Sequence, residues 1–200
     1  MKKFLLICSI IILSVILLVF GTDMVLLNIN YKKNNEIWQE RGEPTLIYDQ
    51  HQYEDIKYGA GNIAKNGCGV CSIYNILYLD GKYVPLPDII KKIYMFGNIG
   101  FGLAGARPSA VMDVLKQYGY EVHYYFNTKQ FDDLAKNSKY SIYLYWGKTK
   151  NGIIGHYQLM TNYNEGTNDY QLYSPYYRST MQKLLDYSKK CCIKVLITVN

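Results

Sequence analysis

Residues 67–79 read GCGVCSIYNILYL, and this stretch decides how the rest of the chain is interpreted. Its apolar residues follow helical spacing through Leu79, and Asp80-Gly81 ends the predicted helix. Cys68 then lies in the first turn, where free backbone N–H groups and the positive end of the helix dipole favour a thiolate. The glycines beside Cys68 leave room for a substrate backbone. Cys68 is therefore a candidate nucleophile, and the alternative is a structural cysteine on the apolar face.

The elements around this stretch predict an α+β domain. A glycine-containing loop without helical periodicity precedes it, over residues 49–67. Helices are predicted at 87–94 and 109–118, shorter helical stretches at 128–136 and 179–187, and strands at 121–126, 140–146, 156–163, 169–173 and 192–199. Helices followed by strands of antiparallel type are the α+β order, not the alternating βαβ order.

Composition excludes several classes of function. The chain has 200 residues, 49% of them hydrophobic, which suits one domain with a substantial core. The net charge of +6 is scattered, and no cluster of Lys and Arg alternates with stacking aromatic residues, so we expect no nucleic-acid partner. The 22 tyrosines suit a half-buried sheet or a binding cleft alike. We expect a monomer.

The N-terminus predicts a membrane segment. Phe4 to Phe20 reads FLLICSIIILSVILLVF without a charge, after Lys2 and Lys3. We therefore expect a signal anchor over 1–22, a polar stalk or surface helix over 23–44, and the folded domain over 45–200. The domain would lie on the extracellular face of the cell membrane. Secretion after signal cleavage is the alternative.

The cysteine pattern leaves a second chemistry open. Cys8, Cys68, Cys71, Cys191 and Cys192 are too few to replace a core by disulfides, and the adjacent pair fits poorly in a zinc site. We expect no metal and no cofactor. Cys68-Gly69-Val70-Cys71 at a helix start also has the form of a redox motif, with Cys68 attacking and Cys71 resolving.

A thiolate nucleophile needs a base that is near in space but can be distant in sequence. The chain offers His51, His123 and His156. His156 follows Gly155 at the start of a predicted strand, which leaves its ring reachable, whereas His123 lies within a strand among aromatic residues. His156 is the preferred base.

Two blocks resemble a known family. Tyr58 to Tyr78, YGAGNIAKNGCGVCSIYNILY, is similar to the loop-and-helix segment of C39-like, papain-fold cysteine peptidases that carries their nucleophile. Gly155 to Tyr163, GHYQLMTNY, resembles the strand that carries their histidine. The resemblance covers about Thr45 to the C-terminus. It implies a papain-like cysteine peptidase fold, with N-terminal helices packed on an antiparallel sheet, Cys68 as nucleophile and His156 as general base.

The same resemblance assigns two further residues. The family's oxyanion donor is a glutamine in an extended segment ahead of the cysteine, and TLIYDQ places Gln50 there, with Gln52 and Asn62 as reserves. The family then has Asp-Pro or Asn-Pro after the next strand, whose side chain orients the imidazole. This chain has Ser174-Pro175, so Ser174 takes the orienting position without a carboxylate.

The sequence thus predicts a membrane-anchored cysteine peptidase or amidase that cleaves peptide or amide bonds. Its partners would be a peptide or protein substrate, such as a cell-wall peptide, and the membrane. Two alternatives remain open: a catalytically inactive C39-like binding domain, and a thiol-disulfide oxidoreductase that uses Cys68 and Cys71.

Overall fold

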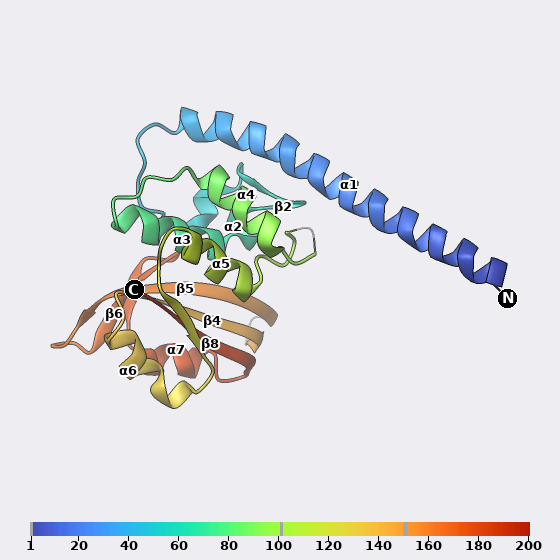
Figure 1. Ribbon diagram of the computed structural model, residues 1–200. Coiled ribbons are helices and arrows are strands. Elements are labelled where there is room, and N and C mark those ends of the chain that lie inside the picture. Colours follow the sequence, from blue (N-terminus) through green and yellow to red (C-terminus); the bar gives the residue numbers. More distant parts are fainter. Residues whose placement is uncertain (1, 101, 150–151) are drawn as a thin grey trace.

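The computed structural model describes residues 2–100, 102–149 and 152–200, and the side chains of all of these except 2–6, 16–20, 149 and 153. Figure 1 shows an α+β arrangement: helices α2 to α5 cover one face of an antiparallel sheet, and α6 and α7 cover the other. The predicted order of helices first and sheet second is confirmed.

The helices are α1 (Lys2–Glu40), α2 (Ile63–Asn66), α3 (Cys68–Leu79), α4 (Leu86–Gly97), α5 (Pro108–Gln117), α6 (Phe131–Lys136) and α7 (Met181–Tyr187), with single turns η1 (Gln50–Tyr53) and η2 (Thr128–Gln130). The strands are β1 (Lys57–Tyr58), β2 (Gly61–Asn62), β3 (Val122–Tyr125), β4 (Tyr140–Thr149), β5 (Gly152–Asn164), β6 (Asp169–Tyr173), β7 (Tyr177–Ser179) and β8 (Cys191–Val199).

The main sheet has the order β3-β8-β4-β5-β6-β7, and every neighbouring pair is antiparallel. Strand β5 pairs with β4 over its whole length, but its described pairing with β6 begins only at Leu159. Over residues 154–158, no described strand pairs with the other edge of β5. The candidate site lies at this edge.

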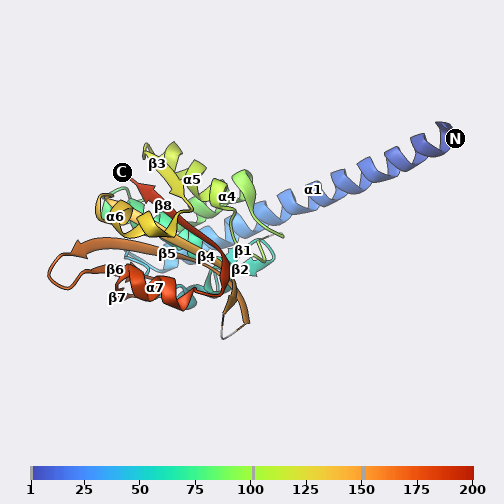
Figure 2. The ribbon, with the colours of Figure 1, turned by 90° about the horizontal axis from the view of Figure 1, so that it is seen from below.

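Two hydrophobic clusters hold the layers together, one on each face of the sheet. The first joins α3, α4 and α5 to side chains such as Leu144, Tyr157 and Leu159. The second joins α6 and α7 to side chains such as Tyr145 and Met160. Because successive strand residues point to opposite faces, Tyr157 belongs to the helical layer while its neighbour His156 faces Tyr145. Figure 2 shows α7 packed on this second face.

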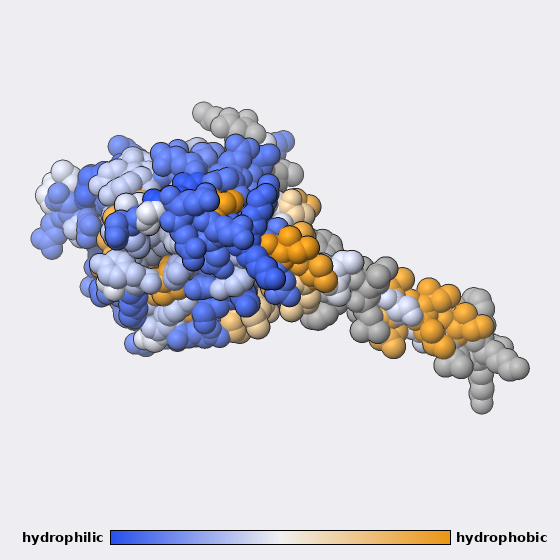
Figure 3. Space-filling model, turned by 90° about the horizontal axis from the view of Figure 1, so that it is seen from above, coloured by the Kyte–Doolittle hydropathy of each residue, from blue (hydrophilic) through white to orange (hydrophobic). Residues whose placement is uncertain are grey.

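The segments predicted as anchor and as stalk or surface helix lie mostly in one continuous helix, α1. Its first half projects away from the rest of the molecule, and Figure 3 shows hydrophobic side chains along it. Over the described residues, no helix combines the length and the apolar character that crossing a membrane requires. The predicted membrane helix over 1–22 is thus not supported, although part of its apolar run, at 2–6 and 16–20, lies outside the described side chains.

The second half of α1 packs on the domain. The side-chain amide of Asn34 donates to the Lys57 carbonyl (2.7 Å) and accepts from the Lys57 N–H (2.8 Å), as a neighbouring strand would. Tyr31 donates to Asp88 of α4 (2.6 Å), and Leu27 is buried in the first cluster. The segment expected to be a stalk or surface helix is therefore a covering helix of the domain.

The loop expected over 49–67 contains short regular elements: η1, the β1–β2 hairpin and α2. Asn62 caps α2 through its side-chain oxygen, which accepts from the Lys65 N–H (3.0 Å). These elements are too short for hydrophobic periodicity to reveal. They carry the chain from Gln50 to Cys68 in a fixed path.

Candidate active site

Helix α3 begins at Cys68 because two glycines allow tight packing around it. A Cβ on Gly67 would lie 2.7 Å from the Cα and carbonyl oxygen of Ile63, and a Cβ on Gly69 would lie 3.2 Å from Val111. The space beside Cys68 is thus filled by the protein itself. The expectation that these glycines leave room for a substrate backbone is wrong; they let α2 and α5 approach α3.

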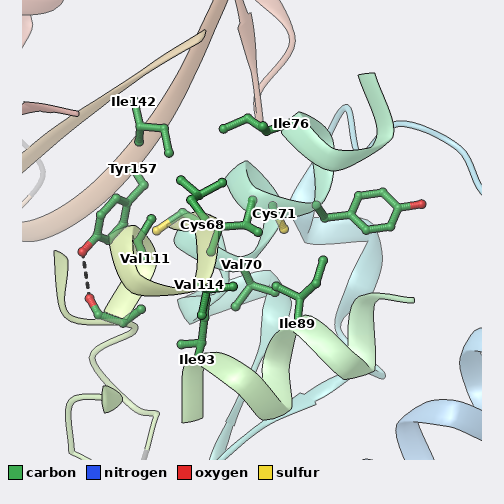
Figure 4. Packing of buried hydrophobic residues seen from close by; sticks show 14 of the residues in the cluster. Cys68, Val70, Cys71, Ile76, Ile89, Ile93, Val111, Val114, Ile142 and Tyr157 are labelled. Atoms are coloured by element: carbon green, nitrogen blue, oxygen red, sulfur yellow. Dashed lines mark hydrogen bonds between the residues drawn. The ribbon is translucent and has the colours of Figure 1, made fainter. Parts of the chain in front are cut away.

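The sulfur of Cys68 lies at the edge of β5. Figure 4 shows the Cys68 side chain extended toward Tyr157. Burial raises the pKa of the Cys68 thiol above the ordinary value of 9.0, since Cys68 is only 7% exposed. The backbone N–H groups of Tyr157, Gly69 and Cys68 lower the pKa, but by less than burial raises it. The predicted helix-terminus stabilisation is present, but the predicted net lowering of the pKa is wrong.

His156 enters the same region from β5. Its ring centroid lies 5.8 Å from that of Tyr145, the residue opposite it on β4. Burial lowers the pKa of His156 below 6.5, while the side chain of Gln158 and the backbone of Ser174 raise it. The ring atom Nε2 is buried and, within the described residues, has no hydrogen-bond partner. A buried nitrogen without a partner is costly, so this atom has hydrogen-bonding capacity left over within the described structure.

Cys68 and His156 approach β5 at neighbouring positions but from opposite faces of the sheet. The start of α3 packs on Tyr157, since a Cβ on Gly69 would lie 3.4 Å from the Tyr157 ring, and Figure 4 shows the Cys68 side chain beside that ring. The His156 ring lies against Tyr145, which belongs to the second cluster, on the face away from α3.

Gln50 and Ser174 form a direct pair. The Gln50 N–H donates to Ser174 Oγ (3.1 Å), and Ser174 Oγ donates to Gln50 Oε1 (3.2 Å). Gln50 Nε2 donates to the carbonyl of Ala64 in α2 (3.0 Å). The Gln50 amide thus connects the segment before Cys68 to the segment after β6. Its Nε2 group keeps one further N–H beyond the bond to Ala64.

The predicted role of the Ser174 hydroxyl needs correction. This hydroxyl is engaged by Gln50, and it is the Ser174 backbone that supports the protonated ring of His156. The second support, Gln158, was not predicted. Its Nε2 donates to the Tyr173 carbonyl (2.6 Å), which leaves its oxygen free to accept from the ring. The sequence signal that could have identified Gln158 is its spacing from His156, because residues two apart on a strand point to the same face.

The other candidates lie elsewhere. The His51 side chain is 77% exposed and bonds Asp49 (2.7 Å), and His123 on β3 bonds Glu121 (2.9 Å). Asn62 is engaged in capping α2, and Gln52 is exposed. All five cysteines are free thiols, and the described residues contain no group of three or more metal-ligating side chains.

Comparisons with known proteins give partial matches in structure and none in sequence. No family model matches the chain, and no curated protein is significantly similar to it. Among solved structures, the peptidase domain of Streptococcus ComA, a bi-functional ABC transporter involved in a quorum-sensing pathway, matches with 13% identity, a TM-score of 0.47, and coverage of 66% of this chain and 89% of that one. The peptidase domain of Streptococcus mutans ComA matches with 14% identity, a TM-score of 0.34, and coverage of 48% and 75%.

Proposed function

We propose that the chain is a C39-like cysteine peptidase or amidase in which Cys68 is the nucleophile and His156 the general base. The observation that carries this proposal is that the start of α3 packs on β5 at Tyr157, the residue next to His156. A nucleophile and its base must lie within hydrogen-bond reach during the reaction, so in this proposal the His156 ring turns toward the sulfur at the edge of β5. The resemblance of the two sequence blocks assigns the same pair.

The resting pair is neutral in this mechanism, because burial raises the pKa of Cys68 and lowers that of His156. The sulfur attacks the substrate carbonyl carbon while its proton moves to His156 Nε2, the nitrogen without a partner. The carbonyl oxygen becomes an oxyanion, stabilised by the Cys68 N–H and the free N–H of Gln50. The imidazolium then protonates the amine as the C–N bond breaks. Water, deprotonated by His156, hydrolyses the thioester and restores the thiol.

The test combines labelling with turnover. An iodoacetamide-type peptide probe is expected to modify Cys68 faster than Cys192, the exposed cysteine that serves as an internal control. Cys68→Ala and His156→Ala should each abolish hydrolysis of a peptide library read by mass spectrometry, while Cys192→Ser retains it. Unchanged hydrolysis in Cys68→Ala would contradict the proposal.

An inactive binding domain is the second candidate, and one observation favours it. Burial holds Cys68 as a thiol, and among the described residues no carboxylate supports the imidazolium of His156, so the groups that activate the nucleophile are weak. In that case the wild type shows no turnover of any peptide in the library, and Cys68→Ala binds the same peptides as the wild type.

Thiol-disulfide exchange fits the structure poorly. Cys71 is fully buried inside α3, and burial raises its pKa well above 9.0. A resolving cysteine must reach a mixed disulfide on Cys68, which this position prevents. We expect the Cys71→Ser variant to keep peptide hydrolysis. If this variant loses hydrolysis and the wild type reduces insulin disulfides, thiol-disulfide exchange is supported instead.

A further inference from the structure

Three tyrosines form an aromatic cluster on the surface beside the candidate site. Tyr48 stacks on Tyr173 with ring centroids 6.2 Å apart, and Tyr176 meets both edge-on, at 4.9 Å from Tyr48 and 5.3 Å from Tyr173. Tyr173 is buried and forms the base of this tyrosine cluster, whereas Tyr48 is 48% and Tyr176 51% exposed. Two large aromatic rings thus remain half open to solvent on a fixed support.

The tyrosine cluster is continuous with the catalytic groups. The Ser174 N–H donates to the Tyr48 carbonyl (3.2 Å), and the Ser174 hydroxyl pairs with Gln50. Ser174 also contributes the backbone group that supports the His156 ring. Ser174 therefore connects the tyrosine cluster both to His156, the proposed base, and to Gln50, the proposed oxyanion donor. The cluster thus adjoins, through Ser174, the groups that the proposed function assigns to the reaction.

The polar groups around the cluster favour a peptide side chain over a sugar. A sugar stacked on an aromatic ring also needs planar polar partners beside it for its hydroxyl groups. Beside Tyr48 in the chain, Asp49 bonds His51, and the Gln50 amide bonds Ala64 and Ser174. The carboxylate next to the cluster is thus already bonded, and the one N–H that Gln50 keeps is assigned to the oxyanion.

We propose that the tyrosine cluster is a specificity subsite that binds an aromatic side chain of the peptide substrate, adjacent to the bond that Cys68 attacks. This inference rests on the proposed hydrolase function and adds its substrate class. Aromatic side chains favour edge-to-face and offset packing on other rings, and the two exposed rings, nearly perpendicular at 87°, provide a face and an edge together.

The experiment uses the full chain and a series of alanine- and glycine-based decapeptides that carry one Phe, scanned through every position. The measured quantity is the ratio of kcat/KM for each Phe peptide to that of the parent peptide without Phe. We expect one position to reach a ratio of about tenfold, the discrimination that one buried apolar group provides in a pocket. In Tyr48→Ala/Tyr176→Ala the ratio should fall to about 1–2.

The control is Tyr124→Ala, an equally exposed tyrosine on β3, at the far end of the sheet order from β6 and β7. It should keep the wild-type ratio. A ratio near one in the wild type, or a ratio that survives the double substitution, overturns the subsite.

A binding measurement distinguishes failure of the subsite proposal from failure of the hydrolase proposal. Fluorescence anisotropy of the labelled Phe peptides is measured on Cys68→Ala and on the same chain with both tyrosines replaced. Selective binding of one Phe peptide that is lost with the tyrosines supports the subsite even if no peptide is cleaved. Displacement by an N-acetylglucosamine tetramer with no selectivity for Phe overturns it in favour of a sugar site.

Discussion

At Cys68 and His156, burial disfavours the charged forms that a thiolate–imidazolium pair would need. A thiol at a helix N-terminus is expected to ionise readily, yet Cys68 is packed so closely that desolvation outweighs the N–H groups facing it. The same burial disfavours the protonated form of His156. Both residues are therefore neutral near pH 7, and the proton must move during the attack rather than before it.

This neutrality predicts the pH dependence of hydrolysis. Neutral His156 is the reactive form, and its pKa lies below 6.5, so kcat/KM should rise through a pKa below that value. The thiol proton is needed for the leaving amine, and the pKa of Cys68 lies above 9.0, so the alkaline fall should come only above pH 9. Kinetics from pH 4 to 10.5 test this. A bell centred near pH 6 would instead indicate a preformed thiolate–imidazolium pair.

Gly67 gives a second prediction at this scale. Its Cβ position lies 2.7 Å from backbone atoms of Ile63, which cannot move as a flexible side chain can. We expect Gly67→Ala to lower the free energy of unfolding by about 1–3 kcal/mol, as overpacking does. Gly21→Ala is the control, since nothing lies within 4 Å of that Cβ position and alanine favours a helix. Urea unfolding measures the free energy of unfolding of both variants. Equal free energies for Gly67→Ala and Gly21→Ala would refute the packing argument.

The longer elements could be predicted from the sequence, and the short ones could not. Helices α3, α4 and α5 and strands β4, β5 and β8 carry clear periodicity, and their predicted positions agree with the structure. The β1–β2 hairpin has two residues in each strand, so no period is visible in it. It is ordered by Asn34, a residue far away in sequence that pairs with Lys57. The resemblance named Gln50 and Ser174, but only three-dimensional contacts show that they bond each other.

The pairing between α1 and β1 predicts an effect on stability. Asn34→Ala removes both hydrogen bonds to Lys57 at a fully buried position, leaving a backbone donor and acceptor without partners. We expect a loss of ~2–4 kcal/mol in unfolding free energy. Asn35→Ala is the matched control, because Asn35 bonds only within its own helix, to the Tyr31 carbonyl, and should change stability by about 0.5 kcal/mol or less. Similar losses in the two variants would contradict the role given to Asn34.

The whole molecule divides at about Asp23. Beyond this residue α1 is tied to the domain, through Tyr94, which donates to Asp23, through Tyr31 and through Asn34. Before it, the described apolar side chains at Ile7, Ile10 to Leu13 and Val15 are more than half exposed. The resulting exposed strip is larger than single surface residues would give, and such strips promote association.

Truncation tests this division. A chain lacking residues 2–22 should unfold with a free energy within about 0.5 kcal/mol of the full chain and remain soluble at higher concentration, because it keeps every contact from Asp23 onward. A chain lacking residues 2–40 should be strongly destabilised, since it loses Leu27 and Asn34 from the buried interior. Chemical unfolding and light scattering measure both effects. A large loss of stability on removing residues 2–22 would show that the division lies elsewhere.

The contacts that hold α1 have a mechanical consequence. The free half of α1 is a rigid lever, and its first fixed points are Asp23 and Tyr31, which bond Tyr94 and Asp88 of α4, ahead of the Asn34 bonds to the hairpin. A sideways force at the tip would act first on α4 and then on the hairpin that leads through α2 into Cys68. Tension on the amino-terminal arm would therefore load the helical layer that carries Cys68 before the sheet that carries His156.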